Sequence, residues 1–429
     1  MFVRQNETLL AIILTLFFQI HTLTAQSSQG ITVQEIHFEG LKKTRVNYLR
    51  QFLSSKEGIA TDSTTLKNDV QYLVNLVAVA NASYQVDTLE EGLSITYKIE
   101  EALTAFPIIN FGGVRGNFWF QLGFTDANWL GKGIQLSSFY QVNDGRNNFN
   151  LYYRVPFISG SRWGASGSFF KYASIEPLFF GDNTVFYNYD NTSIGATGIY
   201  QIDRNHNIEF GGTFFVEEYE KNSRHQGEVT PGPDSRVEEK VLGKLMHRIG
   251  RINYHYYLLK GFDNIANGQA VFNFDDQSWF FIFLNDTRYF KRIGKKGNLA
   301  SRLRLGISTN NDTPFAPFVL DSYFNIRGSG NRIDRGTATA VLNLEYRHSF
   351  YDQGKFAGQV VAFSDLGTWR KPGGDFNELV NGTTLRHFIG GGVRLIYKKA
   401  FNAIFRLDYG IDLHNFDQRG VVVGLGQYF

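Results

Sequence analysis

Apolar and charged residues alternate along most of the chain, from Leu103 to Phe429. Successive side chains of a β-strand point to opposite faces of a sheet, so this alternation predicts strands with one apolar and one polar face. The faces separate most cleanly in three segments, where Leu299, Leu303, Leu305, Ile307, Leu385, Ile389, Val393, Leu395, Phe405, Leu407, Tyr409 and Ile411 oppose Asn298, Arg302, Arg304, Ser308, Arg386, Arg394, Lys398, Arg406, Asp408 and Asp412. Segment 103–429 is therefore predicted to be all-β, either a soluble sandwich or a membrane barrel.

Three features favour the barrel over the sandwich. Aromatic residues make up 16% of the chain and lie near segment ends, as in the aromatic girdles of membrane barrels. At roughly 20 residues per strand and connection, segment 103–429 gives about sixteen antiparallel strands, which must close because lipid tolerates no open edge. The chain also ends on a predicted strand that places Val423, Leu425 and Phe429 on one face. We therefore expect a transmembrane β-barrel at 103–429.

Residues 1–25 have the layout of a secretory signal peptide. Arg4 precedes an apolar run from Leu9 to Ile20, and Leu23-Thr24-Ala25 precedes Gln26. The run is short for a membrane-spanning helix, which needs about 20 apolar residues. We expect export and removal of this segment, with an uncleaved N-terminal anchor as the alternative.

A separate α+β domain is predicted at residues 31–102. A short strand ending at Phe38-Glu39-Gly40 precedes two helical patterns, one opened by Thr44 and one by Asp62 or Ser63. Two strands around Tyr84 and Tyr97 complete the order β-α-α-β-β. This order, together with Lys43-Thr44 and the closing Glu100-Glu101, resembles a polypeptide-transport-associated (POTRA) domain, which is periplasmic; a generic α+β module is the alternative.

Charge and motifs exclude several classes of function. The chain has 43 Lys and Arg against 40 Asp and Glu, so it lacks the excess of basic residues typical of a nucleic-acid binder. It contains no cysteine, and its 9 His have no metal-ligand spacing. The motifs HExxH and GxSxG and the P-loop motif are absent. We expect no enzyme activity, no catalytic residue, no metal, no cofactor and no nucleic acid. The alternative is a barrel enzyme such as a lipase.

The segment Glu217–Lys244 interrupts the strand pattern. It is highly charged and contains Pro231-Gly232-Pro233. We therefore predict a long surface loop at these positions.

A motif within the strand array suggests a family. Ile326-Arg327-Gly328-Ser329 precedes the strands that carry Glu345 and Asp365. This arrangement resembles the barrel of the BamA/TamA family of outer-membrane assembly and translocation proteins. In that family the sixth extracellular loop folds back into the lumen with an (I/V)RG(F/Y) tip, so the resemblance implies that Ile326, Arg327, Gly328 and Ser329 form this tip, with Ser329 in place of the usual aromatic residue.

The resemblance also implies that Glu345 and Asp365 are the acidic lumen partners of Arg327. The alternation supports Glu345 independently, because Leu344 and Tyr346 lie on the opposite, apolar face. It does not place Asp365, since both faces of its strand are largely apolar. The alternative is that all three residues are ordinary solvated lumen charges.

The function implied by the resemblance is outer-membrane protein insertion or polypeptide translocation, without covalent chemistry. The implied partners are unfolded outer-membrane or secreted client polypeptides and outer-membrane lipid, with periplasmic chaperones or lipoproteins as further candidates. Phe429 resembles the C-terminal sorting signal of bacterial outer-membrane barrels. A passive outer-membrane porin and a lipid-handling barrel are the alternatives.

In the family, the first and last barrel strands meet at a weakly paired seam. Six glycines lie in the corresponding regions here, namely Gly112, Gly113, Gly116, Gly420, Gly424 and Gly426. Glycine in a strand interior loosens packing, so these residues either allow the seam to open or fit the curvature of the barrel.

Overall fold

The structure is a computed structural model. It describes residues 31–114, 117–143, 145–158, 160–181, 183–222, 231–311, 313–321, 324–330, 334–380, 382, 384–400 and 403–429, with the backbone alone for 112–114, 117–118 and 143. The signal peptide expected at residues 1–25 and Gly116 of the expected seam lie outside these residues.

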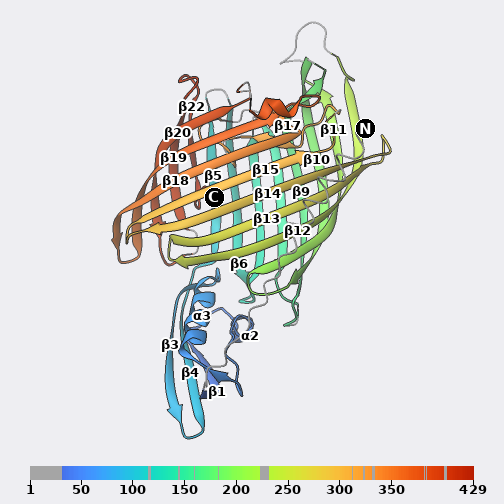
Figure 1. Ribbon diagram of the computed structural model, residues 1–429. Helices are drawn as coiled ribbons and strands as arrows, with labels where there is room; N and C mark the ends of the chain where they lie inside the picture. The colour runs from blue at the N-terminus through green and yellow to red at the C-terminus, as the bar shows by residue number, and fades with distance from the viewer. Residues whose placement is uncertain are drawn as a thin grey trace.

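The N-terminal domain is a mixed sheet with two helices packed on it (Figure 1). Its elements are β1 (Ile31–Glu39), α2 (Val46–Arg50), β2 (Ala60–Thr61), α3 (Ser63–Val74), β3 (Val79–Leu89) and β4 (Gly92–Glu101). The strand order is β2-β1-β4-β3, with β1 parallel to β4. Leu49 of α2 and Leu73 of α3 share one buried core with Ile95 and Tyr97 of β4. The β-α-α-β-β order is present, with the short strand β2 added.

The two helices begin differently. Asp62 caps α3 by accepting a hydrogen bond from the Thr65 amide at 2.7 Å, as predicted. The prediction that Thr44 caps the first helix is wrong, because α2 begins after Arg45 and has no side-chain cap. The Thr44 amide instead donates to Glu101 at 2.7 Å, and its hydroxyl accepts from Asn128 of the barrel at 3.0 Å. No helix among the described residues combines the length and the apolar character needed to span a membrane.

The second part of the chain is a closed antiparallel barrel of sixteen strands, as predicted (Figure 1). The strands are β5 (Ala105–Val114), β6 (Asn117–Trp129), β7 (Ile134–Asn143), β8 (Arg146–Val155), β9 (Trp163–Phe180), β10 (Asn183–Gln201), β11 (His206–Lys221), β12 (Ser235–His255), β13 (Leu258–Asn273), β14 (Ser278–Ile293), β15 (Gly297–Ser308), β18 (Ala338–Gln353), β19 (Phe356–Arg370), β20 (Arg386–Tyr397), β21 (Ile404–Asp412) and β22 (Arg419–Leu425). The last strand, β22, pairs with the first, β5, and closes the barrel.

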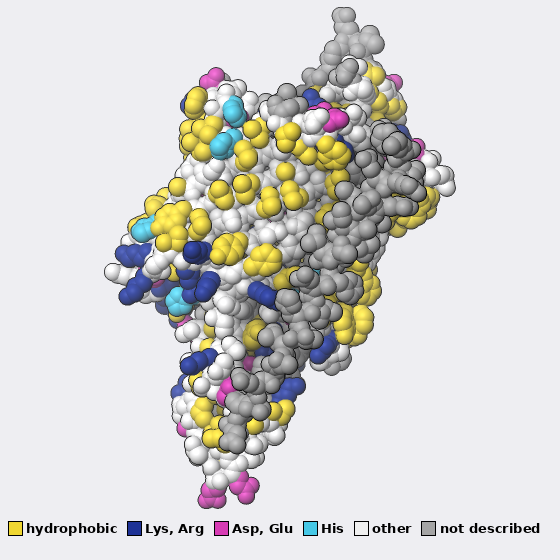
Figure 2. All heavy atoms as spheres, in the orientation of Figure 1, with side chains coloured by type: hydrophobic (Ala, Val, Ile, Leu, Met, Phe, Trp, Pro, Cys, Tyr) yellow, Lys and Arg dark blue, Asp and Glu magenta, His cyan; other side chains and the backbone are white. Residues whose placement is uncertain are grey.

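The apolar faces of the strands point outward and the polar faces point into the lumen, as predicted for a barrel. On β15, Leu303, Leu305 and Ile307 are exposed on the outside, whereas Arg302 is buried in the lumen. Hydrophobic side chains form a band on the visible barrel wall (Figure 2). Trp279 and Tyr289, near opposite ends of β14, are 61% and 48% exposed, in agreement with aromatic girdles. The barrel therefore has the outer surface of a transmembrane protein.

The prediction of a long surface loop at Glu217–Lys244 is wrong. β11 continues to Lys221 and β12 begins at Ser235, so most of this charged segment is paired strand. Glu217 and Lys240 form an ion pair on the inner face, and both are buried. Charged residues pair here across neighbouring strands. The sequence pattern of a single segment does not show such pairs, because the partners lie on different strands.

The N-terminal domain covers one end of the barrel, here called the domain end (Figure 1). Among the described residues, four hairpin turns of the barrel make polar contacts with it, and Phe157 of the β8–β9 turn packs against Phe52 with ring centroids 5.5 Å apart. The Arg45 amide donates to Gly131 of the β6–β7 turn at 2.8 Å, and the Tyr254 amide next to the β12–β13 turn donates to Asn75 at 3.2 Å. Lys399 of the β20–β21 turn forms an ion pair with Glu100 of β4 at 2.8 Å.

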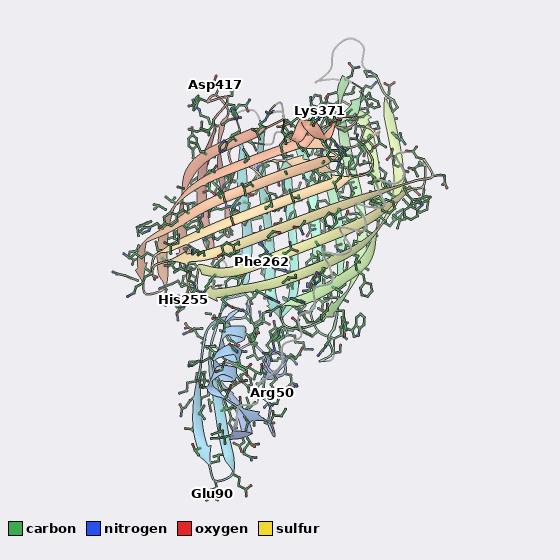
Figure 3. All side chains as sticks on the ribbon, in the orientation of Figure 1. Arg50, Glu90, His255, Phe262, Lys371 and Asp417 are labelled. Carbon is green, nitrogen blue, oxygen red and sulfur yellow. The ribbon has the colours of Figure 1, made fainter. Side chains whose placement is uncertain are left out.

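The fourth contact is an ion pair with a fully buried acid. Asp69 of α3 accepts hydrogen bonds from the amides of Ser54 and Ser55 at 2.6 and 2.9 Å. Arg204 of the β10–β11 turn lies 3.4 Å from the same carboxylate. Figure 3 shows Arg50 and Glu90 in the domain, His255 at the domain end, and Lys371 and Asp417 at the far end.

The chain does not end on a strand, contrary to the prediction. β22 stops at Leu425, and Gly426 turns the chain with φ +88°. The last four residues, 426–429, which we call the tail, enter the lumen. Tyr428 is 7% exposed, and Phe429 packs against Phe290 on the inner wall. The expected sorting strand with Val423, Leu425 and Phe429 on one face is therefore shorter than predicted, and Phe429 does not lie on the outer wall.

Candidate functional site

A loop between β15 and β18 folds back into the barrel. This segment, residues 309–337, is called the lumen loop and contains the small hairpin β16 (Phe318–Leu320) and β17 (Asp334–Gly336). Its tip carries Ile326 and Arg327, both of which are fully buried. Ile326 shares a core with Leu320, Val341, Trp369 and Phe388, so the loop packs on the inner faces of β18, β19 and β20.

Arg327 is held by two carboxylates on neighbouring strands. Its Nε and Nη2 donate to Asp365 of β19 at 2.8 and 2.9 Å, and its backbone amide donates to the same carboxylate at 3.0 Å. Its Nη1 donates to Glu345 of β18. All three side chains are fully buried. A planar guanidinium forked onto two carboxylates is geometrically specific, so this contact fixes the loop tip in one position.

Further charges extend this pair into a cluster. Glu345 also accepts a hydrogen bond from Arg347. Arg394 donates to Asp408 at 2.7 Å and lies 3.7 Å from Glu345. Buried charges are costly unless they are paired, and here ion pairs join three arginines to three carboxylates. These residues are not solvated lumen charges, because their side chains are inaccessible to water.

Aromatic rings enclose the guanidinium of Arg327. The ring centroid of Phe363 on β19 lies 3.7 Å from its Cζ, and that of Tyr428 in the tail lies 4.5 Å away. Such cation–π contacts add to the ion pairs when the group is desolvated. Ser329, where the resembled motif has an aromatic residue, donates instead to the Ile326 carbonyl at 2.8 Å and closes the turn of the tip. The tail thus contributes directly to the arginine site.

Glycines allow the tip to approach the last two strands. Gly328 has φ +92°, and a Cβ there would lie 2.6 Å from the carbonyl oxygen of Gly410 on β21. A Cβ on Gly420 of β22 would lie 2.8 Å from the carbonyl oxygen of Gly328. Gly410 and Gly420 oppose each other in the sheet. The loop tip therefore rests on the backbone of β21 and β22, where only glycine leaves room.

The junction of β22 and β5, which we call the seam, is the shortest contact described between neighbouring barrel strands. Only three residue pairs are in register, Val421 to Val423 with Gly113 to Phe111. Seven pairs join β21 to β22, and ten join β5 to β6. Beyond the three pairs, the Leu425 amide donates to the side-chain oxygen of Asn110 at 3.0 Å. A side chain thus replaces the regular backbone ladder at one end of the seam.

The structure brings together most of the site residues named from the sequence. Ile326, Arg327, Gly328, Ser329, Glu345 and Asp365 form one cluster at the loop tip. Val423 lies in the seam. Phe429 lies in the lumen, where its backbone oxygen accepts a hydrogen bond from Arg347 at 3.3 Å.

Three contributors were not recognised from the sequence. The alternation predicts that Tyr428 continues the last strand, and Phe363 is an apolar residue in a strand without a clear polar face. Asn343 is the third: its side chain donates to the Asn325 carbonyl and to Asp365, each at 2.8 Å. The alternation that identified Glu345 also places Asn343 on the inner face, so this signal was available in the sequence.

Comparison with known proteins supports the fold. No family model matches the chain. The solved structure of BamA from Haemophilus ducreyi lacking POTRA domains 1-3 matches with a TM-score of 0.55 at 15% identity, covering 92% of this chain and 84% of that chain. CdiB from Acinetobacter baumannii matches with a TM-score of 0.59 at 14% identity, covering 93% and 74%. CdiB from Escherichia coli matches with a TM-score of 0.60 at 10% identity, covering 92% and 76%. The chain therefore has the BamA-type barrel fold that its motifs suggest.

Proposed function

We propose that the protein is an outer-membrane factor that inserts or exports client polypeptides through its small domain and the seam of its barrel. The observation that carries this proposal is the placement of the Arg327 site. The buried loop tip rests on β21 and β22, directly beside the shortest strand junction described in the barrel. A passive pore has no need to fasten a loop against a weak junction.

The seam is suited to accept a strand from a client. An unpaired strand edge presents backbone N–H and C=O groups that can pair with any extended segment. Separation of β22 from β5 breaks the ladder of three residue pairs and the contact to Asn110, fewer bonds than any other described junction requires. Each freed edge would then act as a template for a client strand, without nucleotide hydrolysis.

The tail couples the seam to the lumen loop in this proposal. Tyr428 follows β22 by three residues and lies on the guanidinium of Arg327. Movement of β22 away from β5 pulls on the tail and removes this ring from the arginine. Release of the loop and opening of the seam therefore favour each other, since both lose the same contact.

We assign the small domain to the periplasm as a POTRA domain that receives clients. Its β3 is an edge strand of eleven residues, and β-strand addition at such an edge recognises backbone rather than sequence. The opposite sheet edge is partly covered by β2. The domain lies across the end of the barrel, so a client bound at β3 is held close to the barrel.

Depletion of the protein, followed by quantitative proteomics of outer-membrane and secreted fractions, tests the proposal. An Arg327→Ala strain is compared with an Arg288→Ala strain. Arg288 pairs with Asp263 in the lumen and contacts none of the described lumen-loop residues. We expect Arg327→Ala to reproduce the losses seen on depletion, whereas Arg288→Ala does not.

The pattern of loss distinguishes the forms of the function. Loss of many barrel proteins identifies a general insertase, and loss of one or two polypeptides identifies a dedicated translocator. If no polypeptide is lost on depletion, the proposal fails in favour of a porin or a lipid-handling barrel.

A further inference from the structure

Three turns at the domain end of the barrel are rich in lysine. Lys295 and Lys296 lie between β14 and β15, Lys355 lies between β18 and β19, and Lys398 and Lys399 follow β20. Backbone hydrogen bonds join these turns, because Ser349 donates to the Lys296 carbonyl at 2.9 Å and Lys398 donates to the Lys355 carbonyl at 2.8 Å. The lysines therefore belong to one continuous surface.

Two further lysines extend this surface onto the barrel wall. Lys260 lies near the start of β13 and Lys291 near the end of β14. The β13–β14 register places Gly261 opposite Phe290, so Lys260 and Lys291 lie at neighbouring strand ends. Like charges at such positions repel each other. The set Lys260, Lys291, Lys295, Lys296 and Lys355 is called the basic rim.

No acid among the described residues pairs with the basic rim. Lys398 and Lys399 pair with Asp352 and Glu100 at 2.6 and 2.8 Å. Among the described residues, no ion pair joins any of the five lysines of the basic rim to an acid, and all five are exposed. Figure 2 shows Lys and Arg side chains gathered on the rim of the barrel, directly beside the hydrophobic band. This surface is therefore open to an anion from outside the chain.

The neighbouring side chains indicate where that anion lies. Lys291 shares the outer face of β14 with Tyr289 and Ile293, which are 48% and 45% exposed. Phe356 follows Lys355 directly and is 48% exposed. Outward-facing aromatic residues mark the boundary between acyl chains and headgroups in membrane proteins. Lys260 and Lys291 therefore face headgroups, a position that a soluble protein partner does not reach.

We propose that the basic rim binds the phosphate groups of anionic phospholipids in the leaflet on the domain side of the membrane. The proposal rests on the membrane placement in the proposed function, but not on the handling of clients. The turns of the basic rim cover β13 to β19 and stop short of the seam strands β22 and β5. Bound lipid thus anchors the barrel wall away from the seam and leaves the seam strands free to separate.

The test uses the purified protein without residues 1–25, reconstituted in nanodiscs of phosphatidylcholine with increasing amounts of phosphatidylglycerol. Native mass spectrometry then counts the lipids that stay bound when the nanodisc is removed. The test variant carries Lys→Gln at all five positions of the basic rim. The control variant carries Lys→Gln at five exposed lysines elsewhere, namely Lys42, Lys56, Lys67, Lys98 and Lys371. Heat-dependent gel mobility verifies that each barrel is folded.

We expect the natural protein to retain phosphatidylglycerol in preference to phosphatidylcholine, and the basic-rim variant to lose this preference by about tenfold or more, because each lysine near an anionic surface contributes to binding. The control variant should keep the preference, and high salt should weaken it. An equal preference in the natural protein and the basic-rim variant would overturn the proposal.

The proposal also fails if the basic rim binds only an acidic soluble polypeptide, offered to the protein in detergent, because the surface then serves a protein partner. Client assembly is scored separately in the Arg327→Ala strain. Failure of the proposed function is thereby distinguished from failure of the lipid site.

Discussion

Asp365→Asn should release the lumen loop. The carboxylate of Asp365 accepts three hydrogen bonds from Arg327 and one from Asn343, and every side chain involved is buried. Asparagine has the same shape, but it is neutral, and its NH₂ group opposes a guanidinium donor. Removing one partner of a buried ion pair costs about 3 to 5 kcal/mol. Because Glu345 still holds Arg327, we take the lower value of about 3 kcal/mol, which corresponds to a roughly 100-fold rise in the population of the undocked loop.

Hydrogen exchange of the purified protein measures this population. Ile326 and Arg327 are fully buried, and the Ile326 amide donates to the Asp321 carbonyl at 2.9 Å, so exchange at the tip, residues 324–330, requires it to leave the barrel wall. We expect these residues to exchange roughly 100-fold faster in Asp365→Asn, with the β18 amides unchanged. Asp263→Asn is the matched control, since Asp263 is equally buried and binds Arg248 and Arg288 instead. Unchanged exchange at 324–330 in a folded Asp365→Asn barrel would refute the reasoning.

Three further predictions follow from single residues. Gly328→Ala should undock the tip with Arg327 intact, because φ is +92° and the new Cβ would lie 2.6 Å from the carbonyl oxygen of Gly410, so protease accessibility of the loop should rise. Gly354→Ala is the matched control, because Gly354 also has a positive φ of +54° but has open space around the new Cβ. Tyr428→Leu should raise exchange in both the loop tip and β22, since Tyr428 lies on Arg327; a change in only one of them would contradict the coupling. Burial alone would raise the pKa of Glu101, but hydrogen bonds from Thr44 and Lys43 outweigh it and lower this pKa. The ionised Glu101 therefore stabilises the folded domain at pH values above the ordinary pKa of 4.5, and this stabilisation is lost as the pH falls through the lowered pKa. Acid unfolding of the domain, followed by tyrosine fluorescence, should therefore be less steep in Glu101→Gln and unchanged in Glu90→Gln, and equal steepness in all three proteins would contradict this assignment.

The alternation of the sequence predicts the barrel because each strand meets lipid on one side. On β21, Phe405 and Leu407 lie outside and Arg406 lies inside, as the period of two requires. The same rule finds Glu345, because β18 borders a polar lumen on one face. Local chemistry likewise predicts the Asp62 cap of α3. These features depend only on neighbours in sequence and on the two surroundings of each strand, lipid outside the barrel and a polar lumen inside it.

The rule fails where the lumen is filled by protein. The inner face of β19 carries Phe363 and Trp369 beside Asp365, because the lumen loop packs on it and replaces water. A strand with two apolar faces therefore conceals its buried acid. Glu217, Glu238 and Lys240 resemble a solvated loop in sequence, yet Lys240 pairs with Glu217 on the neighbouring strand and with Glu238 on its own strand. The alternation also predicts a strand for the tail, because the contacts of the tail with Arg327 and Phe290 come from distant segments and leave no local pattern.

The opening of the seam is the central claim, and a disulfide tests it most directly, because the chain has no cysteine of its own. Gly113→Cys with Val421→Cys would close the seam, since these residues oppose each other across β5 and β22. Tyr409→Cys with Val421→Cys is the control, because Val421 opposes Tyr409 in the ordinary β21–β22 hairpin. We predict that oxidation of the seam pair stops client assembly, that a reductant restores it, and that the control pair has no effect. Normal client assembly with a fully oxidised seam would contradict the account.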